Sequence, residues 1–233
     1  MPKEEEVMIK TTALRMSKMV YLAGLALALL AGATAADAQS REGRWEFTLG
    51  GFYQLGADLE FEGGSTLETE DDLGFSMSTG YNISDSLTAN FGFGWSGIDY
   101  DATVVKDDGS TTGISGEFDN WNFTAGLLFN LMEGPLTPFI GANVGYSWID
   151  TNVPNGLPQT GCWWDPWYGY ICTTSYPTKT EDTFTYGASL GLRYHFNPGT
   201  FMRLTYSSQW MDLGEATSTP RFDILGLSVG WLF

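Results

Sequence analysis

Side chains that carry most enzyme chemistry are scarce in this chain of 233 residues. It has one histidine, His195, and two cysteines, Cys162 and Cys172. Hydrolysis by an activated serine or water needs a general base close to the nucleophile, and that base is most often histidine. His195 lies in a run of alternating apolar and small residues, so we expect it to fill space inside the fold as a hydrogen-bonded side chain. The sequence therefore predicts no catalytic site and no enzyme.

The two cysteines enclose nine residues rich in aromatic side chains. Their spacing is not that of a CxxC zinc site. In an exported protein the only two cysteines are expected to form a disulfide, and closing so short a ring stabilises the loop by about 3 kcal/mol in the chain-entropy model. Two hypotheses remain for this loop: a rigid platform that recognises a glycan, a host surface or a phage, or a cap whose aromatic residues pack on one another over the mouth of the fold. The aromatic residues are Trp163, Trp164, Trp167, Tyr168 and Tyr170.

The net charge of the chain argues against a nucleic acid partner. The formal net charge is −17, and nucleic acid binding needs basic patches, so we expect no nucleic acid partner. Two acidic groups, Glu70-Asp71-Asp72 and Asp107-Asp108, carry the hard oxygen ligands that Ca²⁺ or Mg²⁺ prefers. Neither has the spacing of a calcium loop. We therefore predict solvated acidic faces, no metal site and no cofactor.

The N-terminal part has the pattern of a secretory signal. Arg15 and Lys18 precede an apolar block at 20–30, and the block ends in small residues with Ala36-Asp37-Ala38. The block is shorter than the roughly 18 residues that suggest a membrane helix. We predict a cleaved signal peptide and N-terminal extension at 1–38, a mature domain at 39–233, and a translation start at Met8 or Met16.

Hydrophobicity with a period of two dominates the mature domain and predicts β-strands. In each segment one face is bulky and apolar, with Leu59 at the end of that face in the first segment, and the other face is small or polar. The connections are alternately long and short, with long loops at about 60–71, 99–116 and 150–181. The strands are predicted at about 45–59, 72–83, 87–96, 120–131, 140–148, 183–196, 202–210 and 221–233.

Eight strands with short and long connections in alternation indicate an antiparallel up-and-down barrel. A barrel of this size has a lumen too narrow for the bulky faces, so they must point outward into lipid. Glu46, Arg193 and Arg203 then point inward near one end. Because buried charges need partners, we predict an ion pair that closes the lumen. The alternative is a narrow channel for small solutes or ions.

The closing strand carries apolar residues at alternate positions and ends in an aromatic one: Leu225, Leu227, Val229, Trp231 and Phe233. This pattern resembles the C-terminal assembly signal of bacterial outer-membrane barrels. The mature domain as a whole resembles the small eight-stranded barrels of the OmpA-like and OmpX-like type, and we expect no OmpA periplasmic domain after Phe233.

The resemblance implies a monomer in the outer membrane of a Gram-negative bacterium, with both termini in the periplasm. Its implied partners are outer-membrane lipid, lipopolysaccharide and, through the C-terminal strand, the barrel assembly machinery. The expected role is structural or surface recognition, with the aromatic loop presenting the binding surface.

Overall fold

The computed structural model describes residues 40–60, 64–105, 109–154, 159–175, 178–212 and 219–233. The predicted signal peptide at 1–38 lies outside these residues, as do Asp107 and Asp108. Within the described ranges, no helix has the length and apolar character to cross a membrane. The regular structure that is described there consists of β-strands.

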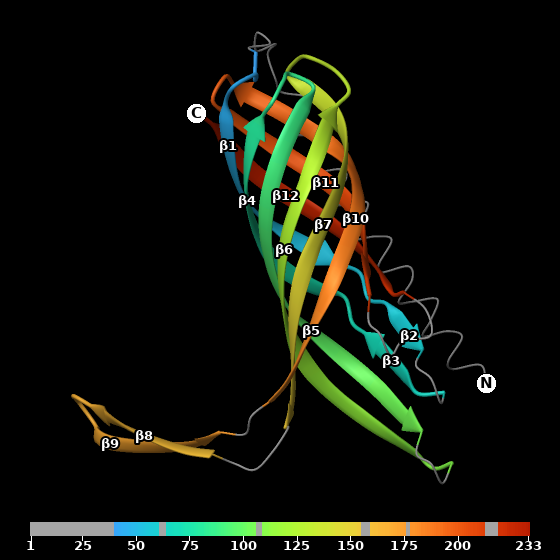
Figure 1. The fold of residues 1–233 in the computed structure, drawn as a ribbon, viewed down its shortest axis with the longest axis vertical. Coiled ribbons are helices and arrows are strands. Elements are labelled where there is room, and N and C mark those ends of the chain that lie inside the picture. The colour runs from blue at the N-terminus through green and yellow to red at the C-terminus, as the bar shows by residue number, and fades with distance from the viewer. Residues whose placement is uncertain (1–39, 61–63, 106–108, 155–158, 176–177, 213–218) are drawn as a thin grey trace. The chain divides into compact units, whose positions relative to one another are not determined.

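Eight of the strands form a closed antiparallel barrel, as the sequence predicts (Figure 1). Each barrel strand pairs with the next one along the chain, and β1 pairs with both β4 and β12, which closes the ring. Glu46 of β1 lies opposite Leu232 of β12, and Gln54 lies opposite Ile224. The barrel strands are β1 (Trp45–Gln54), β4 (Asp72–Asn82), β5 (Leu87–Val105), β6 (Thr111–Asn130), β7 (Leu136–Pro154), β10 (Thr178–Asn197), β11 (Thr200–Met211) and β12 (Arg221–Leu232).

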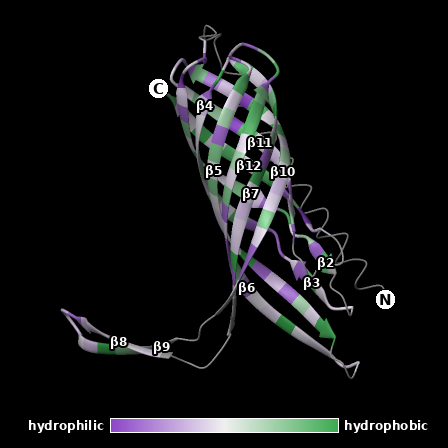
Figure 2. Cartoon of the chain, viewed as in Figure 1, coloured by the Kyte–Doolittle hydropathy of each residue, from purple (hydrophilic) through white to green (hydrophobic). Residues whose placement is uncertain are grey.

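The bulky faces point outward and the small faces point into the lumen, which confirms the predicted orientation. Leu190 and Val144 expose about half of their surface, whereas Thr88 and Thr185 expose none. Hydrophobic and hydrophilic residues accordingly alternate along the barrel strands in Figure 2. Only a lipid phase accommodates so continuous an apolar outer surface on a closed barrel.

The strands are longer than predicted at one end of the barrel. The ladder between β5 and β6 continues to the pair Val105 and Thr111, in a region predicted as a loop. The other two predicted loops also contain strands: β2 (Asp58–Glu60) and β3 (Thr66–Thr69), and β8 (Gln159–Asp165) and β9 (Gly169–Ser175). Backbone pairing forms these extensions, and some of their apolar side chains, such as Leu59 and Leu67, pack in a local cluster instead of facing lipid.

Leu59 also departs from the prediction. The chain leaves β1 after Gln54 and re-enters a strand at Asp58, so the alternation of faces is interrupted between them. Leu59 is 5% exposed and packs in a cluster with Ile149, Met211 and Phe222 rather than facing lipid. Its neighbour in the hairpin, β3, pairs with the extension of β5.

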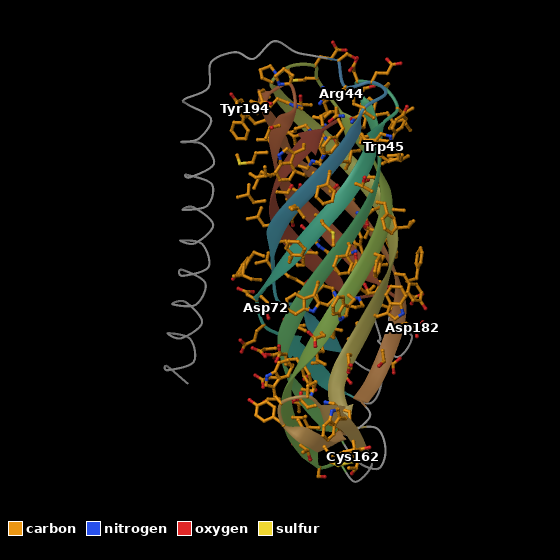
Figure 3. All side chains as sticks on the ribbon, turned by 90° about the vertical axis from the view of Figure 1, so that its left-hand side faces the viewer. Arg44, Trp45, Asp72, Cys162, Asp182 and Tyr194 are labelled. Atoms are coloured by element: carbon orange, nitrogen blue, oxygen red, sulfur yellow. A yellow bond between two sulfur atoms is a disulfide. The ribbon has the colours of Figure 1, made fainter. Side chains whose placement is uncertain are left out.

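The opposite end of the barrel carries the short connections, the start of β1 and the end of β12. We call it the turn end, and the other end the loop end. Arg44 and Trp45 lie at the turn end and Asp72 and Asp182 toward the loop end (Figure 3). Arg44 ties strand ends together here, since its guanidinium donates to the carbonyl oxygens of Pro198 (2.9 Å) and Leu232 (3.1 Å).

Candidate functional site

The three inward charges meet inside the turn end of the barrel. Glu46 Oε1 accepts hydrogen bonds from Nη2 of Arg193 (3.0 Å) and Nη2 of Arg203 (2.6 Å). Arg193 Nη2 also lies 2.9 Å from Glu46 Oε2. Arg193 is fully buried, and Glu46 and Arg203 expose 2% and 6%. Both arginines, rather than one of them, therefore share the carboxylate.

Two inward aromatic rings complete this cluster. Arg193 Cζ lies 4.6 Å from the centre of the Phe201 ring, and Arg203 Cζ lies 5.6 Å from that of Phe139. Both rings are buried, at 0% and 2% exposure. A cation over an aromatic face gains electrostatic energy, most of all when it is desolvated. We call Glu46, Arg193, Arg203, Phe139 and Phe201 the plug.

Glycines in the barrel wall make room for the plug. A Cβ atom built on Gly230 would overlap the ring of Phe201, and one built on Gly191 would overlap the ring of Phe139. A Cβ on Gly80 would approach Cγ of Glu46 to 2.9 Å. These glycines are required by the close approach of neighbouring atoms, which for Gly191 include the backbone oxygen of Leu204, and not by backbone conformation.

Sequence reasoning missed Phe139 and Phe201. Both occupy inward parity on their strands: Phe139 precedes the lipid-facing Ile140, and Phe201 pairs with His195 across the β10–β11 turn. The alternation alone could have placed them in the lumen. They were not predicted because they are bulky, and the lumen face was expected to hold only small or polar side chains and the three charges.

His195 lies beside the plug. Its ring centre is 5.4 Å from that of Phe201. Nε2 has no hydrogen-bond partner in the part of the chain that the structure describes, so the bond expected for a filling residue is not seen at that nitrogen. No group of three or more His, Cys, Asp or Glu residues in the described ranges is arranged to hold a metal ion.

On the side of the plug that faces the loop end, the lumen holds a polar cavity of about 220 Å³. Its wall includes Thr48, Asn90, Asn122 and Ser207, and Arg203 of the plug lies at its border. Asn122 Nδ2 donates to Ser147 Oγ (2.6 Å), which shows that polar side chains link strands across this level. The lumen therefore contains polar space that ends at the plug.

The cysteine loop is a two-stranded sheet of its own. Cys162 and Cys172 are directly opposed in the β8–β9 ladder and form a disulfide. At the tip, Asp165 Oδ1 accepts hydrogen bonds from the backbone N–H groups of Trp167 (2.8 Å) and Tyr168 (2.9 Å). Gly169, with φ of +79°, completes the turn in a conformation that favours glycine.

The aromatic residues of this hairpin are exposed. Trp164 pairs with Tyr170 across the two strands, with ring centres 6.0 Å apart in an edge-to-face arrangement. The exposed fractions are 50% for Trp163, 66% for Trp164, 86% for Trp167, 83% for Tyr168 and 76% for Tyr170. Fractions this high do not fit a cap whose aromatic residues pack on one another.

Two residues of the acidic group at 70–72 form hydrogen bonds to nearby parts of the chain. Asp71 accepts a hydrogen bond from the Tyr53 hydroxyl (2.7 Å) and another from the backbone N–H of Gly56 (2.9 Å). Asp72 accepts one from the backbone N–H of Leu73 (2.6 Å). These contacts hold the segment after β1 against the start of β4.

At the turn end, Asp85 secures the segment that leads into β1. Its carboxylate accepts hydrogen bonds from the backbone N–H of Arg41 (2.6 Å), from that of Glu42 (3.3 Å) and from the Ser40 hydroxyl (3.0 Å). The backbone donor of Arg41 makes the largest contribution to lowering the pKa of Asp85 below its ordinary value. Arg41 in turn donates to the carbonyl oxygen of Met132 (3.3 Å).

A closed antiparallel barrel with an apolar outer wall and a polar, plugged interior defines a membrane-spanning β-barrel protein. Residues 23–233 match the family of the outer membrane protein beta-barrel domain, and this chain belongs to that family. It is therefore a barrel of the Gram-negative outer membrane.

Solved structures agree on the fold. The crystal structure of Neisserial surface protein A matches with a TM-score of 0.50 and 13% identity, over 82% of this chain and 100% of that one. The outer membrane protein OprG from Pseudomonas aeruginosa matches with a TM-score of 0.50 and 13% identity, over 83% of this chain and 97% of that one. No curated protein matches the sequence.

Proposed function

We propose that this protein is a non-conducting outer-membrane anchor that presents the β8–β9 hairpin as a recognition surface on the cell exterior. One observation carries the proposal: Trp164, Trp167, Tyr168 and Tyr170 are each at least 66% exposed on a hairpin closed by a disulfide. When a partner covers aromatic residues exposed to this degree, the burial of their apolar surface contributes favourably to the free energy of binding.

The hairpin is suited to binding because its shape is set in advance. The Cys162–Cys172 bridge and the hydrogen bonds of Asp165 fix both ends of the tip, so little conformational entropy remains to be lost on association. Tyrosine and tryptophan are the residues most enriched at recognition surfaces, since each offers a large contact area with few rotatable bonds.

Charge narrows the class of partner. Residues 159–175 contain no lysine or arginine, and their one charged side chain is Asp165. The chain carries a formal net charge of −17. Sulfated or sialylated glycans would be repelled, whereas aromatic rings can stack on the apolar faces of uncharged sugars. We propose a neutral glycan, on a host surface or on a phage receptor-binding protein, as the partner.

The plug favours an anchor over a channel. Its three charges and two rings lie buried in the lumen at the turn end, where both arginines pair with Glu46. The polar cavity of about 220 Å³ is what a narrow channel for small solutes or ions would need, and it stops at the plug. We propose no catalytic role, because His195 lies beside the plug at the turn end, whereas a cell-surface site would lie at the loop end.

We propose that both termini face the periplasm, as short turns do in bacterial outer-membrane barrels. Leu225, Leu227, Val229 and Trp231 face outward on β12, opposite β1, where the barrel closes. With Phe233 they form the proposed recognition signal for the barrel assembly machinery. A monomer in contact with lipid and lipopolysaccharide completes this assignment.

The binding test uses the full chain refolded into lipid nanodiscs on immobilised neutral and sulfated oligosaccharides. We expect saturable binding to neutral oligosaccharides, and Trp164→Ala with Trp167→Ala should abolish it. Ile114→Ala is the matched control, because Ile114 is an exposed apolar residue (46%) on the β6 extension and lies outside the hairpin. Binding that survives both tryptophan changes, or binding only to sulfated sugars, contradicts the proposal.

A further inference from the structure

The inner wall of the barrel changes character near the loop end. Below this level, β5, β7 and β11 carry the buried polar residues Ser96, Ser147 and Gln209 at inward positions. Two residues further along each of these strands the inward position is apolar and buried. These residues are Ile98 (1% exposed), Ile149 (9%) and Met211 (3%).

The change extends around the barrel. Phe222 of β12 is 3% exposed and belongs to one cluster with Leu59, Ile149 and Met211. Phe118 of β6 and Leu67 of β3 pack against that cluster. An apolar layer therefore crosses the lumen where water would enter from the loop end.

This layer does not fill its own space. It encloses a cavity of about 350 Å³, lined by Leu59, Ile98, Phe118 and Phe222 among others. Ligand pockets of proteins are mostly apolar and measure roughly 300–1,000 Å³. The wall of an eight-stranded barrel usually fills its interior with side chains, so apolar space of this size is not a consequence of the architecture alone.

Two amides form the polar floor of the cavity. Gln54 and Asn120 line both this cavity and the polar cavity beneath it. They are 2% and 6% exposed, and neither Gln54 Nε2 nor Asn120 Oδ1 has a hydrogen-bond partner among the described residues. A buried donor and a buried acceptor without partners cost free energy, and one ligand hydroxyl can accept from the first and donate to the second.

The outer edge of the cavity is acidic. Glu181, Asp182 and Asp212 are exposed residues that also line it. Their carboxylates disfavour entry of an anionic head group, on a chain whose net charge is already −17. The acidic edge therefore disfavours an anionic ligand. The unpaired Gln54 donor needs an acceptor, which a neutral hydroxyl offers and an ammonium group does not.

We propose that the loop-end cavity is a binding site for a small neutral amphiphile, such as a medium-chain alcohol. The apolar chain lies against Ile98, Ile149 and Phe222, and the hydroxyl binds Gln54 and Asn120. This site is independent of the recognition role of the β8–β9 hairpin, because none of the hairpin side chains that the structure describes lines the cavity.

The test uses the full chain in lipid nanodiscs with ¹³C-labelled isoleucine and methionine methyl groups. Titration with 1-octanol should shift the methyl signals of Ile98, Ile149 and Met211 in a saturable manner. Ile140, which is 50% exposed on the outer wall, reports partitioning into the bilayer and should respond without saturation. Octanoate and octane are the matched probes for charge and for the missing hydroxyl.

We expect octanoate to bind at least about tenfold more weakly than 1-octanol. Gln54→Leu should weaken 1-octanol about tenfold and leave octane unchanged, since it removes one hydrogen bond and keeps the volume similar. Ile149→Trp should abolish the binding of both 1-octanol and octane by filling the cavity. Ile140 signals that match those of the wild type before ligand is added show that each variant is folded. Non-saturable shifts at the cavity methyls, octanoate binding equal to that of 1-octanol, or an unchanged 1-octanol affinity in Gln54→Leu would each overturn the proposal.

Discussion

Arg193 and Arg203 face each other directly across the β10–β11 ladder, with both side chains pointing into the lumen. Like charges at directly opposed positions destabilise a sheet. Here the carboxylate of Glu46, which reaches across from β1, binds both guanidinium groups. The barrel thus contains an unfavourable pair whose stability depends on a third residue on a different strand.

Replacing that third residue tests the dependence. We expect Glu46→Gln to lower the free energy of unfolding by about 3–5 kcal/mol, because two buried cations lose their counter-charge. Urea unfolding of the barrel refolded in lipid vesicles measures this change. Glu133→Gln is the matched control, since it removes the same charge from an exposed turn and should change stability by less than about 0.5 kcal/mol. Equal effects of Glu46→Gln and Glu133→Gln on the free energy of unfolding would show that the ion pair does not stabilise the barrel.

The space around Phe201 gives a second test. Gly230→Ala should destabilise the barrel by about 1–3 kcal/mol, because the new methyl group overlaps a ring that is fully buried. Gly226→Ala, on the same strand and the same face, is the control. Its Cβ would meet no atom closer than 3.9 Å, so we expect little change in the same unfolding assay. Two equally tolerated substitutions would mean that the plug can shift freely.

The lipid-facing wall can be tested at Leu190, which is 56% exposed on β10. Leu190→Arg should cost about 2–4 kcal/mol, as a charge does near the middle of the bilayer. Ser207→Asn is the control within the lumen, because Ser207 lines the polar cavity. Ser189 would be a poorer control, since its hydroxyl lies close against Gly141. A smaller cost for Leu190→Arg than for Ser207→Asn would reverse the assignment of inside and outside.

Asp85 predicts how stability depends on pH at the turn end. Hydrogen bonds hold its pKa below the ordinary value, so the folded state favours the carboxylate more than the unfolded state does. The resulting stability is present above the unfolded pKa of about 3.9 and is lost as pH falls through the lower, folded pKa. Wild type should therefore be more stable than Asp85→Asn at pH 7, and the difference should shrink below about pH 4. A difference that stays constant over this range would exclude the carboxylate as its source.

The disulfide should act on the hairpin and leave the barrel unaffected. Reduction of Cys162–Cys172 should make the segment at 159–175 sensitive to protease, because the ladder of β8 and β9 pairs with no barrel strand. The barrel is held by its own closed set of backbone hydrogen bonds, so its heat resistance on gels should be nearly unchanged. Loss of heat resistance on reduction would show that the hairpin supports the barrel.

The alternation of residues was enough to predict the closed barrel and the inward direction of Glu46, Arg193 and Arg203. It could not show that both arginines share one carboxylate, because the relative stagger of β1, β10 and β11 depends on the whole ring. The extensions of β5 and β6 were missed for a different reason. Outside lipid the outward face of a strand no longer needs apolar residues, so the apolar period that marks a strand within the membrane disappears.

The apolar layer at the loop end was also missed. Ile98, Ile149 and Met211 continue the inward parity of their strands, but all three lie just beyond the predicted strand ends at 96, 148 and 210. Extending the alternation by two residues would have placed them in the lumen. Their apolar character was the signal, because on β5, β7 and β11 the inward positions before them are small or polar, apart from the plug.

The most direct test of whether the plug blocks the lumen is the conductance of the refolded protein in a planar lipid bilayer. The plug predicts no discrete openings for the wild-type protein, because Glu46, Arg193 and Arg203 with two aromatic rings fill the lumen at the turn end. Glu46→Gln should introduce openings or raise the leak, since the arginines lose the contact that holds them together. Steady, discrete openings of the wild-type protein would contradict the account.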